Sequence, residues 1–191
     1  MRKIPTLFVR DPDDRRYVLD EITPGCEWVV AGQGVATRKY DGTCVMFDGA
    51  RWWARREVKP GKPTPTNFAA EETDDVTGKT VGWEPIGQSS FAKFHAEALT
   101  SPIGPYEWTA GTYELVGPKI NGNPEKRERH TLIRHETAEP LRIPHPGDHD
   151  SMRDHCLIFY RDFGIEGVVF HHPDGRMAKI KARDFRKGAA D

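Results

Sequence analysis

Four short blocks of polar residues, far apart in the sequence, carry side chains that could act together on a phosphate group. They are Lys39-Tyr40-Asp41-Gly42, a block centred on Glu114, a block that begins at Glu166, and the pair Lys179 and Lys181. A neutral lysine amine is a nucleophile, and this pattern favours attack of Lys39 on the α-phosphate of a nucleoside triphosphate. Pyrophosphate would leave, and a lysine-nucleotide phosphoramidate would remain.

The other charged residues suit supporting roles in such a reaction. A nucleophilic lysine must lose a proton, and neighbouring cations such as Lys179 and Lys181 lower a lysine pKa from its reference value of about 10.4. The same two cations can hold phosphate oxygens. Glu166 is suited to bind the divalent metal that shields the triphosphate. Glu114 is suited to accept hydrogen bonds from ribose hydroxyls.

Longer strings around these blocks resemble the ATP-dependent RNA ligases, which share the covalent nucleotidyltransferase superfamily with DNA ligases and mRNA capping enzymes. The resemblance covers nearly the whole chain and is greatest for the RNA ligase 1-like branch. The strings that carry it are Ala36 to Cys44, Trp53-Ala54-Arg55-Arg56 with Lys59-Pro60, and Thr112-Tyr113-Glu114-Leu115-Val116-Gly117 followed by Asn121-Gly122-Asn123-Pro124.

The resemblance implies a role for each matching residue. Lys39 would carry AMP, Glu114 would bind ribose, and Glu166 would hold Mg²⁺ or Mn²⁺ and count as catalytic. Lys179 and Lys181 would be both catalytic and phosphate-binding. The remaining nucleotide-binding residues would be Arg38, Asp41, Gly42, Arg55 and Arg56.

The same resemblance implies an activity and a fold. ATP would donate AMP to the lysine, AMP would pass to an RNA 5′-phosphate, and an RNA 3′-hydroxyl would displace it to seal the strand, a reaction suited to RNA repair. The expected fold class is α+β, with antiparallel sheets enclosing the nucleotide in a single nucleotidyltransferase domain, the ATP-grasp-like adenylation domain of ligases. We expect this domain to span residues 1–191, without an OB or other accessory domain.

Two positions depart from the related families. DNA ligases usually carry an arginine two residues after the glycine of the first block, where this chain has Cys44, and this difference disfavours a DNA ligase. The block that supplies an aromatic shelf for adenine is replaced by 130–135, in which histidine provides the only rings.

Composition limits the partners and the cellular location. The formal net charge of -1 and pI near 6.7 provide no global attraction to RNA, so RNA ends would need a local basic patch. The three cysteines are odd in number and widely spaced, which argues against a disulfide framework and favours the cytoplasm. No membrane span is expected. The candidate residues for the basic patch are Lys119, Arg127, Arg129, Arg134, Arg183 and Arg186.

Turn residues and hydrophobic spacing predict a mostly β chain with two helices. Asp48-Gly49 and 172–175 are typical of hairpin turns, and the second hairpin should bring Glu166 close to Lys179. The stretch 59–87 shows no sustained period and is expected to be a long loop. One helix should follow Ser89 or Ser90. The other should be capped by Asp150 or Ser151, end at Gly164, and bury Met152, His155, Cys156, Phe159 and Tyr160.

Three other functions fit parts of the pattern. A guanylyltransferase would use the same lysine with GTP. A non-catalytic nucleotide-binding or RNA-binding module would hold ATP without a covalent adduct. A lysine Schiff-base enzyme would act on carbonyl substrates, for which the paired lysines are less suited than for phosphate.

Overall fold

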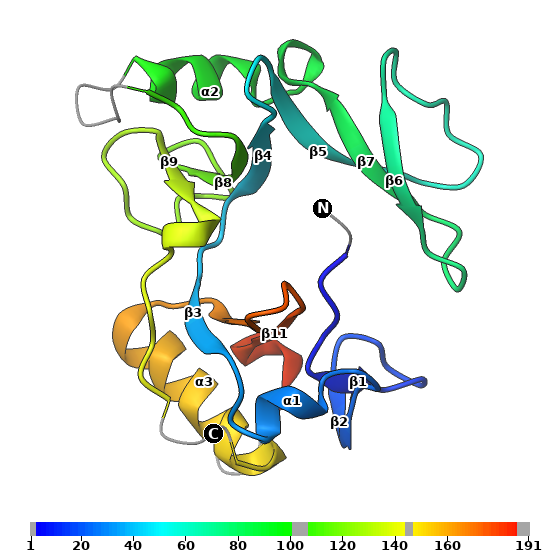
Figure 1. The fold of residues 1–191 in the computed structure, drawn as a ribbon, viewed down its shortest axis with the longest axis vertical. Helices are drawn as coiled ribbons and strands as arrows, with labels where there is room; N and C mark the ends of the chain where they lie inside the picture. Colours follow the sequence, from blue (N-terminus) through cyan, green and yellow to red (C-terminus); the bar gives the residue numbers. More distant parts are fainter. Residues whose placement is uncertain (1–2, 101–106, 144–146, 187–191) are drawn as a thin grey trace. The chain divides into compact units, whose positions relative to one another are not determined.

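The computed structural model describes residues 3–100, 107–143 and 147–186 and is an α+β structure with mostly antiparallel sheets (Figure 1). The chain divides into two units. Unit 1 comprises Met1–Lys3 and Asp41–Thr137, and unit 2 comprises Ile4–Tyr40 and Ala138–Asp191. The chain therefore passes from unit 2 into unit 1 between Tyr40 and Asp41, one residue after Lys39. Each unit is described separately below.

Unit 2 is built on a three-stranded antiparallel sheet in the order β11-β10-β3. The hairpin of β10 and β11 turns through the predicted residues 172–175, because Gly175 adopts a φ of 91° that favours glycine. The elements of this unit are β1 (Phe8–Arg10), β2 (Val18–Ile22), α1 (Glu27–Val30), β3 (Val35–Lys39), α3 (His149–Phe163), β10 (Gly167–His171), β11 (Met177–Lys181) and η3 (Ala182–Asp184).

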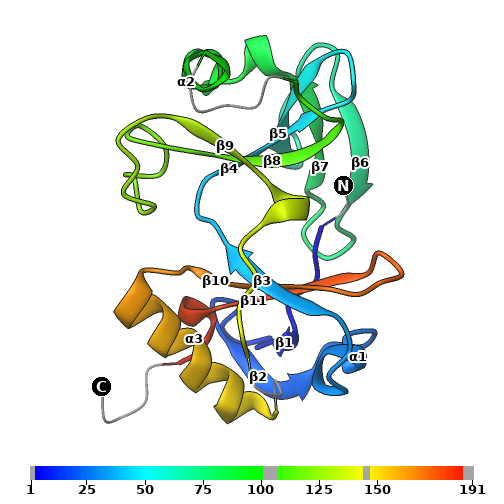
Figure 2. The same cartoon turned by 60° about the vertical axis from the view of Figure 1, so that its left-hand side comes forward.

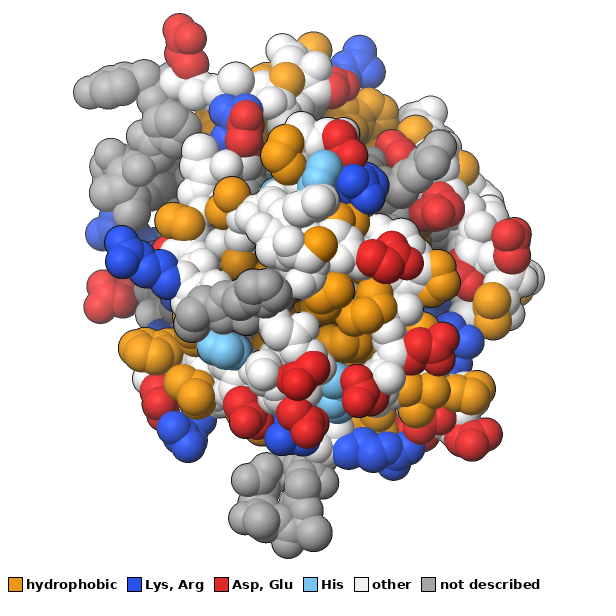
Figure 3. Space-filling model, turned by 60° about the horizontal axis from the view of Figure 1, so that its bottom comes forward, with side chains coloured by type: hydrophobic (Ala, Val, Ile, Leu, Met, Phe, Trp, Pro, Cys, Tyr) orange, Lys and Arg blue, Asp and Glu red, His pale blue; other side chains and the backbone are white. Residues whose placement is uncertain are grey.

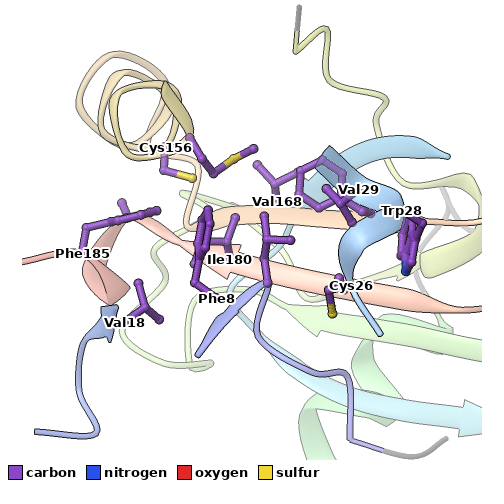
Figure 4. Packing of buried hydrophobic residues seen from close by; sticks show 14 residues of the cluster. Phe8, Val18, Cys26, Trp28, Val29, Cys156, Val168, Ile180 and Phe185 are labelled. Atoms are coloured by element: carbon purple, nitrogen blue, oxygen red, sulfur yellow. The ribbon is translucent and has the colours of Figure 1, made fainter. Parts of the chain in front are cut away.

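One face of this sheet forms the core of unit 2, and α3 lies along it (Figure 2). Ile180 alternates with Lys179 and Lys181 on β11, and Val168 lies directly opposite Ile180 on β10, so the side chains of Val168 and Ile180 share the face that packs against α3 and Phe8 (Figure 4). Val168, Ile180 and Phe8 are fully or almost fully buried. The alternating residues, Lys39 and Lys181 among them, are directed to the opposite face.

The limits of α3 differ in part from the prediction. Asp148, and neither Asp150 nor Ser151, is the N-cap, because its carboxylate accepts a hydrogen bond from the Ser151 amide at 2.9 Å. Gly164 ends the helix in the left-handed conformation, as predicted. Met152 and Cys156 are buried, whereas Tyr160 is 61% exposed and was wrongly assigned to the inner face.

Unit 1 is built on a six-stranded antiparallel sheet in the order β6-β7-β5-β4-β8-β9. The predicted hairpin at Asp48-Gly49 is present between β4 and β5. The elements of this unit are β4 (Thr43–Phe47), β5 (Trp52–Val58), β6 (Ala69–Thr73), β7 (Thr80–Pro85), η1 (Ile86–Gln88), α2 (Ala92–Leu99), β8 (Gly111–Val116), β9 (Thr131–Arg134) and η2 (His135–Thr137).

The prediction of a loop over 59–87 is wrong, because β6 and β7 lie within it. β7 pairs along its whole length with β5, which supplies backbone partners that no local pattern reveals. β6 is an edge strand with four of its five residues exposed, so it has no apolar period.

The two faces of the six-stranded sheet differ in character. One face packs against α2, with Val45, Tyr113 and Leu115 at its centre. Because side chains alternate along a strand, Cys44 and Glu114 are directed to the other face. In the described part of the chain, the longest helix has 15 residues, and none has the length and apolar character needed to cross a bilayer.

Candidate functional site

The amines of Lys39 and Lys181 meet at the carboxylate of Glu166 in unit 2. The Lys39 amine donates to one carboxylate oxygen at 2.6 Å, and the Lys181 amine donates to the other at 2.5 Å. The Arg183 guanidinium lies 3.2 Å from the second oxygen. Glu166 is 8% exposed, and the side chains of Lys39 and Lys181 are 21% and 16% exposed. Three cations thus surround one buried carboxylate.

Sheet register explains how residues so distant in sequence come together. Lys39 and Lys181 both lie opposite Gly167, one on each neighbouring strand. Their side chains therefore point to the same face and flank the backbone next to Glu166. A Cβ atom at Gly167 would lie 2.2 Å from the Ile180 carbonyl oxygen, so this close pairing requires glycine.

Burial and charge act on these groups in opposite directions. Burial acts to raise the pKa of Glu166, but the positive charges of Lys39 and Lys181 outweigh it and hold that pKa below its ordinary value. Burial, followed by the charge of Lys39, lowers the pKa of Lys181, although Glu166 partly offsets the effect. The cluster therefore keeps its carboxylate ionised and holds the pKa of Lys181 below its ordinary value.

Lys179 and Arg38, the two other candidate residues of unit 2, lie outside this cluster. Lys179 lies opposite Val169, two residues from Lys181, and shares its face of the sheet. The hairpin thus brings Glu166 onto Lys181, where the sequence predicted Lys179. Arg38 is directed to the opposite face, where its guanidinium lies 4.8 Å from the Tyr40 ring centroid and 3.5 Å from the Glu139 carboxylate.

Glu114 organises a second cluster, within unit 1. One of its carboxylate oxygens accepts a hydrogen bond from the Gly42 amide at 3.1 Å, and the other lies 2.9 Å from His135 Nε2. Gly42 can approach this closely because it has no side chain, since a Cβ atom there would lie 2.3 Å from the Leu115 carbonyl oxygen. Glu114 is 9% exposed, and its two carboxylate oxygens contact the half-buried residues Gly42 and His135.

The loop after β8 fixes the segment that follows the candidate nucleophile. The Glu125 carboxylate accepts a hydrogen bond from the Asp41 amide at 2.9 Å. The Asn121 amide group donates to the Asp41 carboxylate at 3.0 Å and to the Gly42 carbonyl at 2.8 Å. Asn121 and Asn123 have positive φ values, which asparagine tolerates better than most residues. The Asn-Gly-Asn-Pro string therefore shapes a loop that holds Asp41 and Gly42.

The two arginines of β5 face opposite sides of the six-stranded sheet. Arg55 lies opposite Trp83 and shares the face of Cys44 and Glu114, while Arg56 is exposed on the other face. The Arg55 guanidinium lies 5.8 Å from the Trp83 ring centroid. Of the two, Arg55 is therefore the arginine on the Glu114 face.

Sequence reasoning missed three residues of these clusters as site residues. Arg183 was assigned only to a basic patch, His135 only to a block without an aromatic shelf, and Glu125 was not singled out. The histidine rings of that block have distinct partners, since His130 stacks on Phe94 at 4.7 Å between ring centroids. The only available signal was the position of Glu125 next to the Asn-Gly-Asn-Pro string.

Basic residues do not form one continuous area on the face shown in Figure 3, where Lys and Arg side chains alternate with Asp and Glu. Three of the candidate patch residues are paired with acids: Arg134 with Glu136, Arg183 with Glu166, and Arg186 with Asp11. A groove of about 840 Å³ in unit 2 is lined by Val29, Ala36, Leu141, Phe170 and others, and it includes none of the cluster residues.

No protein-family model matches the chain. The chain is similar to two proteins named RNA ligase 1, from Rattus norvegicus and Mus musculus, with 25% identity to each over an alignment of 216 residues. Each alignment covers 76% of this chain and 65% of the relative, so the chain spans slightly less than two thirds of the proteins that it matches. The similarity indicates a distant RNA ligase-like relationship.

Proposed function

We propose that this protein is an ATP-dependent RNA ligase of the RNA ligase 1-like branch, with Lys39 as the residue that carries AMP. The observation that carries the proposal is the buried Glu166 carboxylate between the amines of Lys39 and Lys181, at 2.6 and 2.5 Å. The distant similarity to RNA ligase 1 of rat and mouse supports the same reading. In this proposal, both units form one nucleotidyltransferase domain. The protein is assigned to the cytoplasm.

The first step forms a bond between Lys39 Nζ and the α-phosphorus of ATP. The bond from that phosphorus to the bridging oxygen of pyrophosphate breaks, and the amine loses a proton. A lysine attacks only as the neutral amine, so the Lys39 amine must lose a proton before the N–P bond forms, and Glu166, which accepts its hydrogen bond, is placed to take that proton. Lys181, with Lys179 on the same face, provides positive charge for the phosphate oxygens.

Within unit 1, the proposal assigns nucleotide-binding roles to Glu114, Gly42 and Arg55. Glu114 presents a fixed carboxylate that can accept hydrogen bonds from ribose hydroxyls, and Gly42 keeps that carboxylate in place. Arg55, on the same face as Glu114, provides a guanidinium for phosphate oxygens. We assign Asp41 a positioning role, because its backbone amide and its carboxylate are bound by Glu125 and Asn121.

The proposal includes a divalent cation at Glu166, which would replace a contact of Lys39 or Lys181 with the carboxylate. Mg²⁺ and Mn²⁺ take carboxylate oxygens together with phosphate oxygens, and one buried carboxylate beside the phosphate-binding lysines offers that donor set. Glu166 would hold the ion, which would shield the negative charge of the triphosphate.

In the second step an oxygen of an RNA 5′-phosphate attacks the same phosphorus, the N–P bond breaks, and Lys39 regains a proton. In the third step an RNA 3′-hydroxyl attacks the 5′-phosphate and AMP leaves, which seals the strand. These steps give the protein two RNA ends as substrates and a role in RNA repair.

The test follows a labelled AMP group through the cycle. The protein is incubated with α-labelled ATP and Mg²⁺, separated from free ATP, and mixed with RNA that has a 5′-phosphate and a 3′-hydroxyl. We expect label on the protein, then on the RNA 5′-end, and then release of AMP with sealed RNA. Label on the protein that never moves to RNA would contradict the ligase assignment. Labelling by GTP in place of ATP would indicate a guanylyltransferase, and bound nucleotide without an adduct would indicate a binding module.

A further inference from the structure

Three side chains of unit 1 bring donor atoms of different kinds to one point. The Cys44 sulfur, a Glu114 carboxylate oxygen and a His135 ring nitrogen all lie within 4.8 Å of one another. Glu114 is buried, and Cys44 and His135 are half-buried. The proposed ligation cycle gives no task to the thiol or the imidazole.

The fold holds these three donors in a defined arrangement. Cys44 and Glu114 are direct cross-strand partners in β4 and β8, so their side chains lie side by side on one face. His135 begins η2, directly after β9, and its Nε2 lies 2.9 Å from a Glu114 oxygen. Its Nδ1 lies 3.0 Å from the Thr112 hydroxyl. Contacts at both ring nitrogens therefore fix the orientation of the imidazole.

This arrangement has the features of a site for a transition-metal ion. A metal-binding histidine usually has its second ring nitrogen hydrogen-bonded to a neighbouring group, and Thr112 supplies that contact. The Glu114 oxygen on the His135 side can face an ion while the other oxygen remains on the Gly42 amide. Ligand atoms around tetrahedral zinc lie about 3.3–3.6 Å apart, given bonds of about 2.0–2.3 Å. On binding, the 2.9 Å contact between His135 Nε2 and the Glu114 oxygen would lengthen, and spacings of up to 4.8 Å would shorten.

The donor types select the kind of ion. Thiolate and imidazole are ligands of zinc and related ions, whereas Mg²⁺ takes oxygen donors. We propose that Cys44, Glu114 and His135 bind one thiophilic divalent cation of the zinc class, at a site separate from Glu166. Three protein donors leave the fourth position to water or a ligand. Binding takes a proton from the Cys44 thiol, so affinity rises with pH.

The proposed metal site has a consequence for nucleotide binding, which rests on the proposed function. Glu114 is the carboxylate assigned to ribose, and an ion bound to its oxygen competes with ribose for it. A zinc-class ion should therefore inhibit transfer of AMP to Lys39, and Mg²⁺ should not relieve this inhibition, because it does not bind the thiol.

Cobalt provides a direct test that is independent of catalysis. The metal-free protein is titrated with Co²⁺, which absorbs in the near ultraviolet when it is bound to a thiolate. We expect that band to saturate at one ion per chain, Zn²⁺ to displace the cobalt, and Cys44→Ser to abolish the band. His135→Gln should weaken cobalt binding at least tenfold. The matched control is His172→Gln, which alters another histidine beside a carboxylate, 2.7 Å from Asp174, and should leave binding unchanged.

The wild-type titration decides the proposal even if a variant folds poorly. Absence of a thiolate band in the wild-type protein would overturn the site, and so would a band that persists in a folded Cys44→Ser variant. Inhibition is then measured as AMP labelling with Zn²⁺ divided by labelling without it, for each variant. Cobalt binding without any AMP labelling would overturn the ligase proposal and support the metal site. Zn²⁺ binding that leaves AMP labelling undiminished would overturn the proposed competition between the ion and ribose for Glu114.

Discussion

The Lys39 amine donates a hydrogen bond of 2.6 Å to the carboxylate of Glu166, although the two residues are 127 positions apart in the sequence. Both belong to unit 2, where Lys39 ends β3 and Glu166 immediately precedes β10. This ion pair is largely buried. Lys181 donates to the other oxygen of the same carboxylate, so the three side chains form one electrostatic unit. Their removal should therefore affect stability as well as activity.

Replacing Glu166 with glutamine should destabilise the protein. Glu166→Gln keeps the size of the side chain but leaves Lys39 and Lys181 without their negative partner in a mostly buried position. We expect the free energy of unfolding to fall by about 3 kcal/mol, as for other broken buried ion pairs. Urea denaturation measures the change. The control is Glu57→Gln, which breaks the more exposed pair with Lys79 and should cost less than about 1 kcal/mol. Equal losses in the two variants would contradict the burial argument.

The same pair predicts a dependence of stability on pH. The pKa of Glu166 in the folded protein lies below its ordinary value of 4.5, because Lys39 and Lys181 outweigh the effect of burial. A depressed carboxyl pKa stabilises the fold above the unfolded-state value, and this stabilisation is lost as pH falls through the folded-state value. The difference in unfolding free energy between wild type and Glu166→Gln should be constant above about pH 5.5 and shrink below pH 4.5. A difference that grows at low pH would refute the assignment.

The two arginines of β5 should contribute unequally to nucleotide binding. Arg55 shares a sheet face with Glu114, and Arg56 is directed to the other face. A hydrogen bond from a charged group is worth about 1.5–3 kcal/mol, so Arg55→Ala should weaken ATP binding or slow AMP transfer by about tenfold or more. Arg56→Ala should have a much smaller effect. Both are measured by AMP labelling over a range of ATP concentrations, and a larger effect of Arg56→Ala would reverse the assignment.

Glu125 should act by positioning the segment after Lys39. Glu125→Ala leaves the Asp41 amide without its acceptor, and we expect AMP transfer to slow by about tenfold. Glu125→Gln retains an oxygen acceptor and should restore most of the rate. A role in charge alone predicts that the two variants are equally impaired, and labelling kinetics separate these cases.

Gly167 should be required for the sheet that brings the two lysines together. A Cβ atom at this position would lie 2.2 Å from the Ile180 carbonyl oxygen, and backbone atoms cannot easily move away. Gly167→Ala should reduce the free energy of unfolding by at least about 2 kcal/mol. Gly87→Ala is the matched control, because no atom lies within 4 Å of a Cβ atom there. Thermal unfolding that ranks the two variants equally would argue against the register.

Local signals predicted the parts of the fold that local chemistry determines. The hairpins at Asp48-Gly49 and 172–175 were found because their turn residues favour those backbone conformations. β6 and β7 were missed because an exposed edge strand has no apolar alternation and because β7 depends on pairing with β5. The N-cap of α3 was misplaced by two or three residues, since several neighbouring polar residues could each serve as a cap.

The candidate site was predictable in residue types and less so in contacts. The sequence indicated that Lys39, Glu166 and a lysine of β11 belong together, but only the register with Gly167 selects Lys181 as the partner in contact. The partners of Glu114 and Asp41, namely His135 and Glu125, depend on long-range packing that no local pattern encodes. Because side chains alternate along β3 and β5, Arg38 and Lys39 point to opposite faces of their sheet, and so do Arg55 and Arg56. The face of each residue follows once the buried face of each sheet is known.

The most direct test of the central claim is the intact mass of the protein after incubation with ATP and Mg²⁺ or Mn²⁺, followed by peptide mapping of any adduct. We predict the addition of one AMP group, located on Lys39, which is absent from Lys39→Ala and present in Lys79→Ala. Lys79 is a suitable control because it also pairs with a glutamate, at 2.9 Å, on an exposed part of unit 1. An unmodified wild-type protein with either metal, or an adduct that persists in Lys39→Ala, would contradict the account.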